Sequence, residues 1–192
     1  MAVNTKIYDK RFFENTIKFE GPSAKAVVDI LMKHFAPASV VDIGCGAGIY
    51  LREFEQYGVD IEGFDGSPAA VEESLVGAKI KAYDLTTPLS LNRRFDLVLC
   101  IEVAEHLEKE FADVLVDTLC RLGDILVFTA ATPGQGPESI GHINEQPHDY
   151  WIDKFSQRGF AYDDRTTEVV RKEMTDSDVV WWVSKNLMIF KK

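Results

Sequence analysis

Residues Asp42-Ile43-Gly44-Cys45-Gly46-Ala47-Gly48 decide the fold that this sequence predicts. The β-branched run Ser39 to Ile43 enters this segment as a strand, and residues with helical spacing, Ile49 to Tyr57, leave it. The glycines therefore lie in a turn between a strand and a helix, where a backbone without Cβ atoms can approach a ligand closely. The start of the following helix adds free N–H groups and the positive end of its dipole. This turn is predicted to bind a polar or anionic group.

The alternation of strands and helices continues along the chain. Further strands are predicted over residues 61–64, 80–83, 95–101, 125–130, 160–165 and 187–190, and helices over residues 24–35, 68–75, 108–122, 150–158 and 177–184. The run at 95–101 is nearly all apolar after Asp96, as in a parallel strand that is covered on both faces. Such alternation implies right-handed crossovers with helices on both faces of the sheet. The predicted fold class is therefore α/β, doubly wound around a mostly parallel seven-stranded sheet.

The length of 192 residues predicts one domain over residues 1–192. Residues 1–22 are interpreted as an irregular N-terminal arm, because their aromatic residues follow no clean period. Residues 132–149 form a polar loop, and its length favours a functional lid on the substrate side over a simple connection.

Composition argues against several classes of partner. No apolar stretch approaches the roughly 20 residues that cross a bilayer, and no basic and apolar leader opens the chain, so we expect a cytoplasmic protein without a membrane partner. The 31 acidic residues outnumber the 21 basic ones, which argues against nucleic acid as a partner. No Cys-x-x-Cys pair and no histidine and carboxylate group with metal-ligand spacing occurs, so a metal-free reaction is expected. The sequence leaves the oligomeric state open.

A second binding signal lies at the end of the next predicted strand. Asp65 follows Gly44 at about the 20-residue spacing at which a carboxylate takes up ribose hydroxyls. Dinucleotide-binding folds use Gly-x-Gly-x-x-Gly, and the third glycine position is Ile49 here. The two signals together predict an adenosine-type nucleoside. A nicotinamide-dependent oxidoreductase is an alternative that Ile49 disfavours.

From these residues outward, the chain resembles the class I S-adenosylmethionine-dependent methyltransferases, whose first motif is an acidic residue followed by Gly-x-Gly-x-Gly. The resemblance continues through Asp65-Gly66-Ser67, Tyr83-Asp84-Leu85 and Ile101 to Leu107, which carries the Glu-His-Leu of the family's small-molecule branch. It implies a Rossmann-like fold with an antiparallel last strand. It also implies S-adenosylmethionine as cofactor and methyl transfer as the activity.

The resemblance implies roles for individual residues as well. Asp42 is expected near the methionine amino group, Asp65 at the ribose and Asp84 at the adenine amino group. The expected cofactor-binding residues are Asp42, Gly44, Cys45, Gly46, Gly48, Asp65, Gly66, Ser67, Asp84, Leu85, Ile101 and Glu102.

Histidines near the predicted sheet edge are the candidates for catalysis. His142 lies in the long loop close to Glu145, which can orient its ring, and a neutral imidazole accepts a hydroxyl proton near pH 7. His106 follows the central strand and is also expected at the site. The alternative for His142 is a histidine that stabilises the loop, and for His106 a structural residue at a helix start.

The acceptor is expected to be a small polar metabolite, methylated at a hydroxyl, with a sugar or a secondary metabolite favoured. The segment Ile101 to Ala104 lacks the Asn/Asp-Pro-Pro-aromatic motif of enzymes that methylate base amines and amide nitrogens. The loop and the residues after it supply groups that suit a hydroxyl-rich ligand, namely Gln135, Glu138, His142, Asn144, Glu145, Gln146, Tyr150 and Trp151. The other alternative is an inactive S-adenosylmethionine-binding or scaffold protein.

Overall fold

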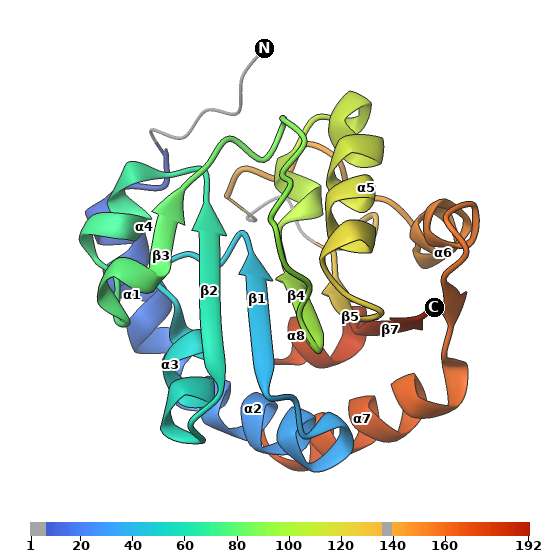
Figure 1. Cartoon of the computed structure of the whole chain (residues 1–192), viewed down its shortest axis with the longest axis horizontal. Coiled ribbons are helices and arrows are strands. Elements are labelled where there is room, and N and C mark those ends of the chain that lie inside the picture. Colours follow the sequence, from blue (N-terminus) through green and yellow to red (C-terminus); the bar gives the residue numbers. More distant parts are fainter. Residues whose placement is uncertain (1–6, 136–139) are drawn as a thin grey trace.

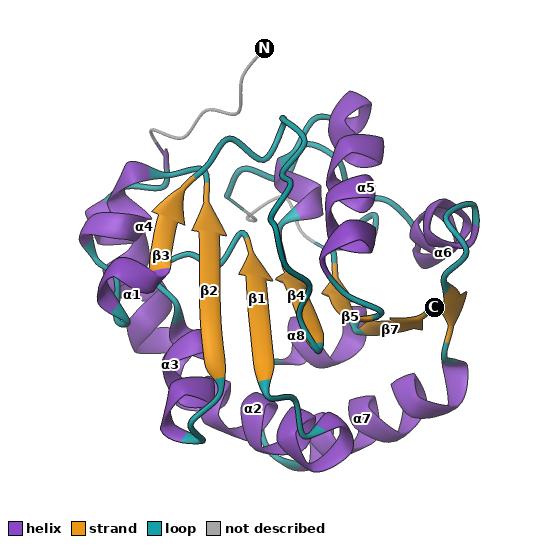
Figure 2. Ribbon diagram, viewed as in Figure 1, coloured by secondary structure: helices purple, strands orange, loops and turns teal. Residues whose placement is uncertain are grey.

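A computed structural model describes residues 7–135 and 140–192. This part of the chain forms a seven-stranded sheet in the order β3-β2-β1-β4-β5-β7-β6 (Figures 1 and 2). The strands are β1 (Ser39–Ile43), β2 (Asp60–Asp65), β3 (Ile80–Ala82), β4 (Leu97–Ile101), β5 (Ile125–Thr129), β6 (Ala161–Tyr162) and β7 (Met188–Lys191). Strands β1 to β5 run parallel, and β7 pairs antiparallel with β5 and β6. The predicted fold class is confirmed, including the antiparallel last strand.

Helices cover both faces of this sheet (Figure 2). They are α1 (Lys10–Phe19), α2 (Gly21–Phe35), α3 (Ile49–Gln56), α4 (Pro68–Glu72), α5 (Ala112–Leu122), α6 (His148–Ser156), α7 (Asp164–Asp176) and α8 (Trp181–Asn186), with short 3₁₀ turns η2 (Gly77–Lys79), η3 (Ala104–His106) and η4 (Lys109–Phe111). One core cluster joins the sheet to α2, α3 and α7, and the other joins it to α5 and α6. The arrangement is therefore the three-layer sandwich that the alternation of elements predicts.

The central strand β4 shows why its sequence is apolar throughout. All five of its residues are buried. Leu97 and Leu99 pack in the cluster with α2 and α3, whereas Val98 and Cys100 pack in the cluster with α5. Because successive side chains of a strand point to opposite faces, a strand covered on both sides has no position for a polar residue.

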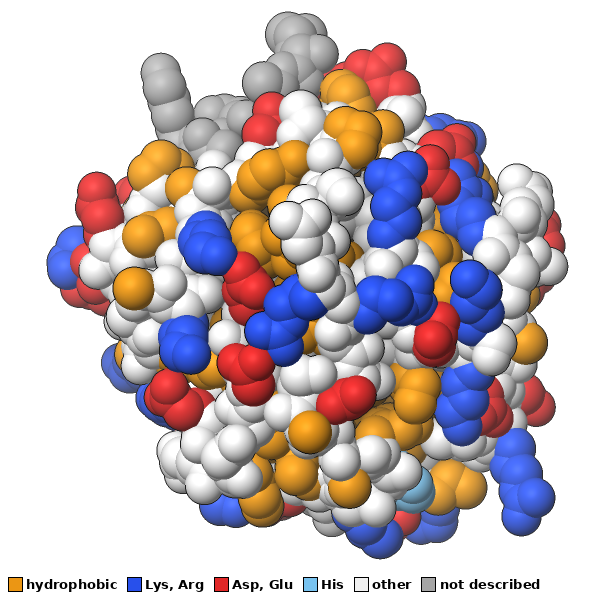
Figure 3. All heavy atoms as spheres, in the orientation of Figure 1, with side chains coloured by type: hydrophobic (Ala, Val, Ile, Leu, Met, Phe, Trp, Pro, Cys, Tyr) orange, Lys and Arg blue, Asp and Glu red, His pale blue; other side chains and the backbone are white. Residues whose placement is uncertain are grey.

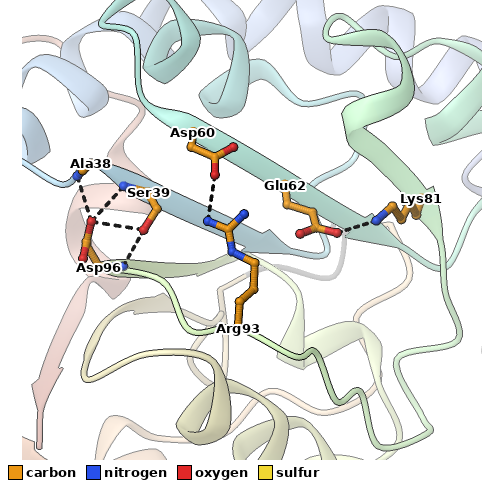
Figure 4. Close-up of polar contacts among 7 residues, drawn as sticks. All are labelled: Ala38, Ser39, Asp60, Glu62, Lys81, Arg93 and Asp96. Atoms are coloured by element: carbon orange, nitrogen blue, oxygen red, sulfur yellow. Dashed lines mark hydrogen bonds and ion pairs between the residues drawn. The ribbon is translucent and has the colours of Figure 1, made fainter.

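Polar contacts hold the amino-terminal edge of the sheet (Figure 4). The Asp96 carboxylate accepts hydrogen bonds from the backbone N–H groups of Ala38 and Ser39, both at 2.9 Å, and so ties the start of β4 to the start of β1. Arg93 pairs with Asp60 of β2 at 2.7 Å. These contacts fix the amino-terminal edge of the sheet. The loops at the carboxyl edge make no part of this network.

The structure differs from the predicted secondary structure at two places. The N-terminal segment that was expected to be irregular forms helix α1 from Lys10, capped by Asp9, whose side chain accepts from the Phe12 N–H at 2.9 Å. Only Phe13 of this helix is fully buried, while Phe12 and Ile17 pack beside it as partly buried residues, so the apolar face is narrow in a segment that also carries many charges. Residues 1–6 of the expected arm lie outside the described residues.

The second correction concerns the predicted strand at 160–165. Strand β6 ends at Tyr162, and the Asp163 side chain caps helix α7 by accepting from the Thr166 N–H at 3.0 Å. No helix is predicted over 164–176, because α7 buries only Thr167, Val170 and Met174. Three buried positions in a polar segment are too few to show as a stripe.

Charges of both signs are interspersed on the face shown in Figure 3, with lysines and arginines beside aspartates and glutamates. Neither sign gathers into one patch on that face. In the described part of the chain, no helix combines the length and the apolar character needed to cross a membrane.

Candidate functional site

A cavity of about 1070 Å³ opens at the carboxyl edge of the parallel strands. Its walls come from the turns after β1, β2, β3 and β4, from the loop after β5, from α1 with the residues that flank it, and from the start of α8. The lining residues that the sequence did not place at the site include Thr16, Glu20, Tyr50, Ile140, Trp181 and Trp182. Open parallel sheets bind ligands at this edge, so the cavity is the candidate site.

The glycine turn and Asp65 form one hydrogen-bonded unit in this cavity. The Asp65 carboxylate accepts from the Gly46 N–H at 2.8 Å through Oδ2 and from the Ser67 N–H at 2.8 Å through Oδ1. Gly44 and Cys45 donate their N–H groups to the Phe64 carbonyl at 2.7 and 3.2 Å. These hydrogen bonds join the carboxyl ends of β1 and β2 and hold the Asp65 carboxylate at the cavity wall. Each of its oxygens can accept a further hydrogen bond from a ligand.

Gly44 is required by both conformation and space. Its φ is +80°, and a Cβ added there would lie 2.3 Å from Cγ2 of Val103. We expect Gly44→Ala to destabilise the fold by roughly 2–5 kcal/mol, from left-handed strain and overpacking together. Urea unfolding measures this loss.

Gly58 provides the matched control for that substitution. Its φ is +75°, but a Cβ there meets nothing within 4 Å, so Gly58→Ala carries the strain alone. If Gly44→Ala were no more destabilising than Gly58→Ala, the close packing of the turn against Val103 would be contradicted.

Two carboxyl groups that line the cavity have their pKa values raised by burial. Asp42 is 2% exposed, and its carboxylate has no hydrogen-bond partner within residues 7–135 and 140–192. Burial raises the pKa of Asp42 to about 7, with a further contribution from Asp65. Burial likewise raises the pKa of Glu20 to about 7, with a contribution from Glu102. A buried carboxylate without a partner is costly, so this arrangement favours a cationic ligand group beside Asp42.

Two histidines, His106 and His142, line the cavity. Nδ1 of His142 lies 2.9 Å from Oε1 of Glu145, and Oε2 of Glu145 accepts from the Gly134 N–H at 3.0 Å. The hydrogen bond from His142 lowers the pKa of Glu145. Because an ionised carboxylate only accepts, this hydrogen bond requires a proton on Nδ1 of His142, and Nε2 is the ring nitrogen left for a ligand.

His106 is held by the N-terminal segment of the chain. Its Nδ1 lies 2.9 Å from the Tyr8 hydroxyl, and its ring meets that of His142 at a centroid distance of 4.9 Å. Burial lowers the pKa of His106 to about 4, so its ring is neutral at pH 7. Burial also raises the pKa of Tyr8 to about 12, which keeps that hydroxyl protonated.

Glu105 fastens the long loop onto the sheet edge. Its backbone carbonyl accepts from the N–H groups of Ile143 and Asn144 at 2.9 and 3.0 Å, and the Asn144 side chain donates to the Ala104 carbonyl at 3.3 Å. The Glu105 carboxyl is fully buried and accepts from the Ala131 N–H at 3.1 Å. Burial and the neighbouring Glu102 raise the pKa of this carboxyl well above its usual range. These bonds bring His142 beside His106.

Glu102 shows backbone strain at the end of β4. Its φ is +53°, a value that residues with a side chain rarely adopt. Its N–H donates to Oγ1 of Thr129 at 2.8 Å, and its carboxylate accepts from the Asn186 side chain at 3.1 Å. The strained backbone therefore places a carboxylate in the cavity wall, as functional sites often do.

Most residues that the sequence placed at the cofactor line this cavity. They are Asp42, Gly44, Cys45, Gly46, Asp65, Gly66, Ser67, Asp84, Leu85, Ile101 and Glu102. Gly48 is not among the lining residues and instead begins α3 with a φ of +83°. Asp84 accepts from the N–H and the hydroxyl of Thr86 at 3.0 and 2.7 Å, so it also caps the turn that follows β3.

The long loop contributes fewer groups to the cavity than the sequence suggested. Gln135, Ile140 and His142 line it, and His106 lines it from the turn after β4. Trp151 is fully buried in the core, and Asn144 and Gln146 hydrogen bond to each other at 2.8 Å. Glu138 lies outside the described residues.

Comparison with known proteins identifies the family. A family model described as a methyltransferase domain matches residues 22–123, more than half of the chain. The chain belongs to this methyltransferase family. The match runs from α2 through α5 and so includes the glycine turn, Asp65 and the turn after β4.

Curated relatives of this methyltransferase domain match over part of their length. The mitochondrial ubiquinone biosynthesis O-methyltransferase of Schizosaccharomyces pombe is 30% identical over 106 residues, which cover 50% of this chain and 39% of that protein. The ubiquinone biosynthesis O-methyltransferase of Rhodopseudomonas palustris is 33% identical over 81 residues, which cover 39% and 32%. The chain therefore matches well under half the length of these relatives.

Solved structures show the same fold over nearly the whole chain. The sugar N-methyltransferase KedS8 from Streptoalloteichus has a TM-score of 0.73 and 15% identity and covers 95% of this chain and 92% of its own. A SAM-dependent methyltransferase from Archaeoglobus fulgidus has a TM-score of 0.67 and 18% identity and covers 94% and 99%. The predicted class I methyltransferase family and its cofactor, S-adenosylmethionine, are thus confirmed.

The residues of the cavity fit this cofactor. Its amino group and sulfonium are cationic, and Asp42 supplies a buried carboxylate with no hydrogen-bond partner among the residues that the structure describes. Its ribose offers two hydroxyls, and Asp65 keeps free acceptor capacity after its two backbone hydrogen bonds. Asp42, Asp65 and the glycine turn between them would hold the cofactor.

Proposed function

We propose that this methyltransferase domain methylates a hydroxyl of a small polar metabolite, with a sugar or a secondary metabolite as the acceptor class. The observation that carries the proposal is the position of His142. Its Nε2 lone pair lies in the same cavity as Asp65 and Asp42, and Glu145 fixes its tautomer at 2.9 Å. A cofactor edge and an oriented imidazole that can activate a hydroxyl, in one cavity, suit O-methylation.

The cofactor brings the activated methyl group, and the protein supplies position and exclusion of water. Asp65 would hold the ribose of the cofactor and Asp42 its amino group, and His106 and His142 line the same cavity. Alignment of this kind contributes up to roughly 7–11 kcal/mol in ideal cases. The partly exposed Trp182 and the exposed Ile140 and Trp181 line the cavity and offer apolar surfaces to an acceptor.

Proton transfer from the acceptor hydroxyl is the remaining task. His106 is neutral at pH 7, and Tyr8 occupies its Nδ1. His142 has its second nitrogen available and a carboxylate, Glu145, that stabilises a positive ring. His142 is therefore the residue through which the hydroxyl is activated, and Glu145 positions it.

Cofactor affinity should depend on pH through Asp42. The pKa of Asp42 is about 7 in the free protein, and a cationic ligand group requires the ionised form. We expect the Kd for S-adenosylmethionine to fall by up to about tenfold per pH unit as pH rises toward 7, and to level off above it. Isothermal titration calorimetry between pH 5.5 and 8.5 measures this profile.

The control for this profile is Glu20→Gln, which removes the other cavity carboxyl with a pKa of about 7. Asp42→Asn should flatten the dependence and Glu20→Gln should leave it. Because ionising buried Asp42 is costly, the ligand-free protein should lose stability as pH rises from the ordinary pKa of 3.8 to about 7, and this loss should level off above it. An unchanged profile in Asp42→Asn would contradict the assignment.

The acceptor class is tested with tritium-labelled S-adenosylmethionine. The protein is incubated with separate pools of sugars, nucleotide sugars, phenolic metabolites, small acids, tRNA and proteins. We expect label in a small hydroxyl compound, retained after acid treatment as a methyl ether is. Label only in macromolecules would contradict a small acceptor, and binding without transfer to any pool would favour the inactive alternative.

A further inference from the structure

Two residues that line the cavity, His106 and His142, converge with the buried side chain of Glu105 in a cluster that could hold a metal ion. Glu105, His106 and His142 each offer one ligand atom, and these atoms lie within 4.8 Å of one another. Glu105 and His106 belong to η3 after β4, whereas His142 belongs to the loop after β5. The sequence alone suggested a metal-free reaction because these ligands come from two separate segments.

Glu105 supplies an independent sign that a ligand is missing. It is 0% exposed, and its Oε2 has no hydrogen-bond partner among the described residues, while Oε1 accepts from the Ala131 N–H. Buried carboxylate oxygens are almost always paired with a donor, water or an ion. The core therefore holds this oxygen beside two imidazoles, and the side-chain contact that acts on the Glu105 carboxyl comes from another acid, Glu102.

The partners behind the histidines match those of metal ligands. Metal-binding histidines usually bond their other ring nitrogen to a carboxylate, carbonyl or hydroxyl, which fixes tautomer and orientation. Glu145 does this for Nδ1 of His142 at 2.9 Å, and Tyr8 contacts Nδ1 of His106 at 2.9 Å. The loop that carries His142 is itself pinned to the Glu105 carbonyl. Neighbouring side chains and the backbone thus fix the orientation of His106 and His142.

We propose that Glu105, His106 and His142 bind one divalent first-row transition-metal ion. Two imidazoles and one carboxylate suit such ions better than magnesium or calcium, which prefer all-oxygen sites. Three protein ligands leave a coordination position open, as in catalytic sites. Ligands at about 2.1 Å from a tetrahedral ion lie about 3.4 Å apart, so side-chain shifts of about an ångström close the observed cluster.

The open position gives the ion a role in methyl transfer, and this half rests on the proposed function. The acceptor hydroxyl oxygen binds at that position, and its O–H bond breaks with loss of the proton to water. The oxygen lone pair then forms the bond to the methyl carbon while the carbon–sulfur bond breaks and leaves its electron pair on sulfur. His142 activates the hydroxyl through the ion in this scheme, and does not take the proton itself.

Metal binding is tested on the full chain without cofactor or acceptor. Protein stripped with EDTA is titrated with CoCl₂, with calorimetry for stoichiometry and visible absorption for ligand type. We expect one Co²⁺ per chain without the near-ultraviolet band of thiolate ligands, which separates this site from Cys45. Glu145→Gln should weaken binding about 10–100-fold, as loss of a ligand's outer partner does.

Variants decide which residues bind the ion. His142→Ala and Glu105→Gln should lose the Co²⁺ site, and His34→Ala and His148→Ala, which alter histidines outside the cluster, should keep it. Glu105 is fully buried, so Glu105→Gln can unfold the protein, whereas His142 lies in a loop and its substitution should leave the fold intact. Thermal melts of both variants show whether each is folded before its Co²⁺ binding is compared. Binding that is unchanged in His142→Ala, or no binding to the parent protein, would overturn the proposal.

The catalytic half has a separate readout. With an acceptor found, EDTA should abolish methyl transfer and Co²⁺ or Mn²⁺ should restore it, while S-adenosylmethionine binding stays unchanged. Co²⁺ binding with transfer that resists EDTA would overturn the role of the ion and leave His142 as the base. Co²⁺ binding without transfer to any acceptor would support the metal site and contradict the proposed function.

Discussion

Asp65→Ala should weaken S-adenosylmethionine binding by about 100-fold or more. The substitution removes the acceptor for the Gly46 and Ser67 N–H groups and for the ribose hydroxyls. Hydrogen bonds to a charged group contribute roughly 1.5–3 kcal/mol each. The loss of two such bonds from the ribose hydroxyls therefore already accounts for an affinity weaker by about 100-fold. In a thermal melt, ligand at 100 times the Kd should stabilise the parent protein by about 2.7 kcal/mol, and most of that gain should disappear.

Asp60→Ala is the matched control, because Asp60 lies at the amino end of the same strand and contacts Arg93 at 2.7 Å (Figure 4). Its ligand-induced shift should equal that of the parent protein. Asp65→Asn tests the charge separately, since it keeps an acceptor oxygen for the turn. Parent-like affinity in Asp65→Ala, with a normal circular dichroism spectrum, would remove Asp65 from the cofactor site.

His142→Ala should lower methyl transfer by roughly 10²–10⁴-fold, the range for loss of a group that assists removal of the hydroxyl proton. Its Kd for S-adenosylmethionine should stay unchanged, because the contacts of Asp42, Asp65 and the glycine turn remain. Turnover to S-adenosylhomocysteine and calorimetric Kd, measured on the same preparation, separate the two quantities. Glu145→Gln should show a smaller loss, because the ring keeps Nε2 but loses a charged partner.

His34→Ala is the control for this substitution. His34 lies on α2 and contacts Glu173 at 3.2 Å, away from the cavity. His106 does not serve as a control, because its ring lies 4.9 Å from that of His142 in the same cluster. A fall in cofactor affinity in step with turnover would place His142 on the cofactor side and contradict its role toward the acceptor.

The cofactor half of the site was predictable because its signals are local. The glycine turn follows β1 directly, and Asp65 ends the neighbouring strand β2. Parallel strands deliver their carboxyl ends to one edge, so two short motifs suffice to place both groups in one cavity. The strand pattern was predictable for a similar reason, since central strands such as β4 are apolar along their whole length.

The acceptor half depended on contacts that sequence spacing does not encode. Tyr8 reaches His106 across 98 positions, and Asn186 reaches Glu102 across 84. Glu105 belongs to the motif Ile101 to Leu107, which the sequence shows. Its burial and its Oε2 atom without a hydrogen bond follow only from the packing of the loop after β5. Helix α7 was missed because it buries few residues, and its partners on α2 are distant in sequence.

A crystal structure with bound S-adenosylhomocysteine is the most direct test of the site. We expect the ribose hydroxyls at Asp65, the amino group at Asp42 and the sulfur directed toward His106 and His142. That result would place the transferred methyl group on the side where the acceptor hydroxyl is activated. Electron density for the ligand away from the glycine turn, or a sulfur that faces away from the two histidines, would contradict the proposed methyl transfer in this cavity.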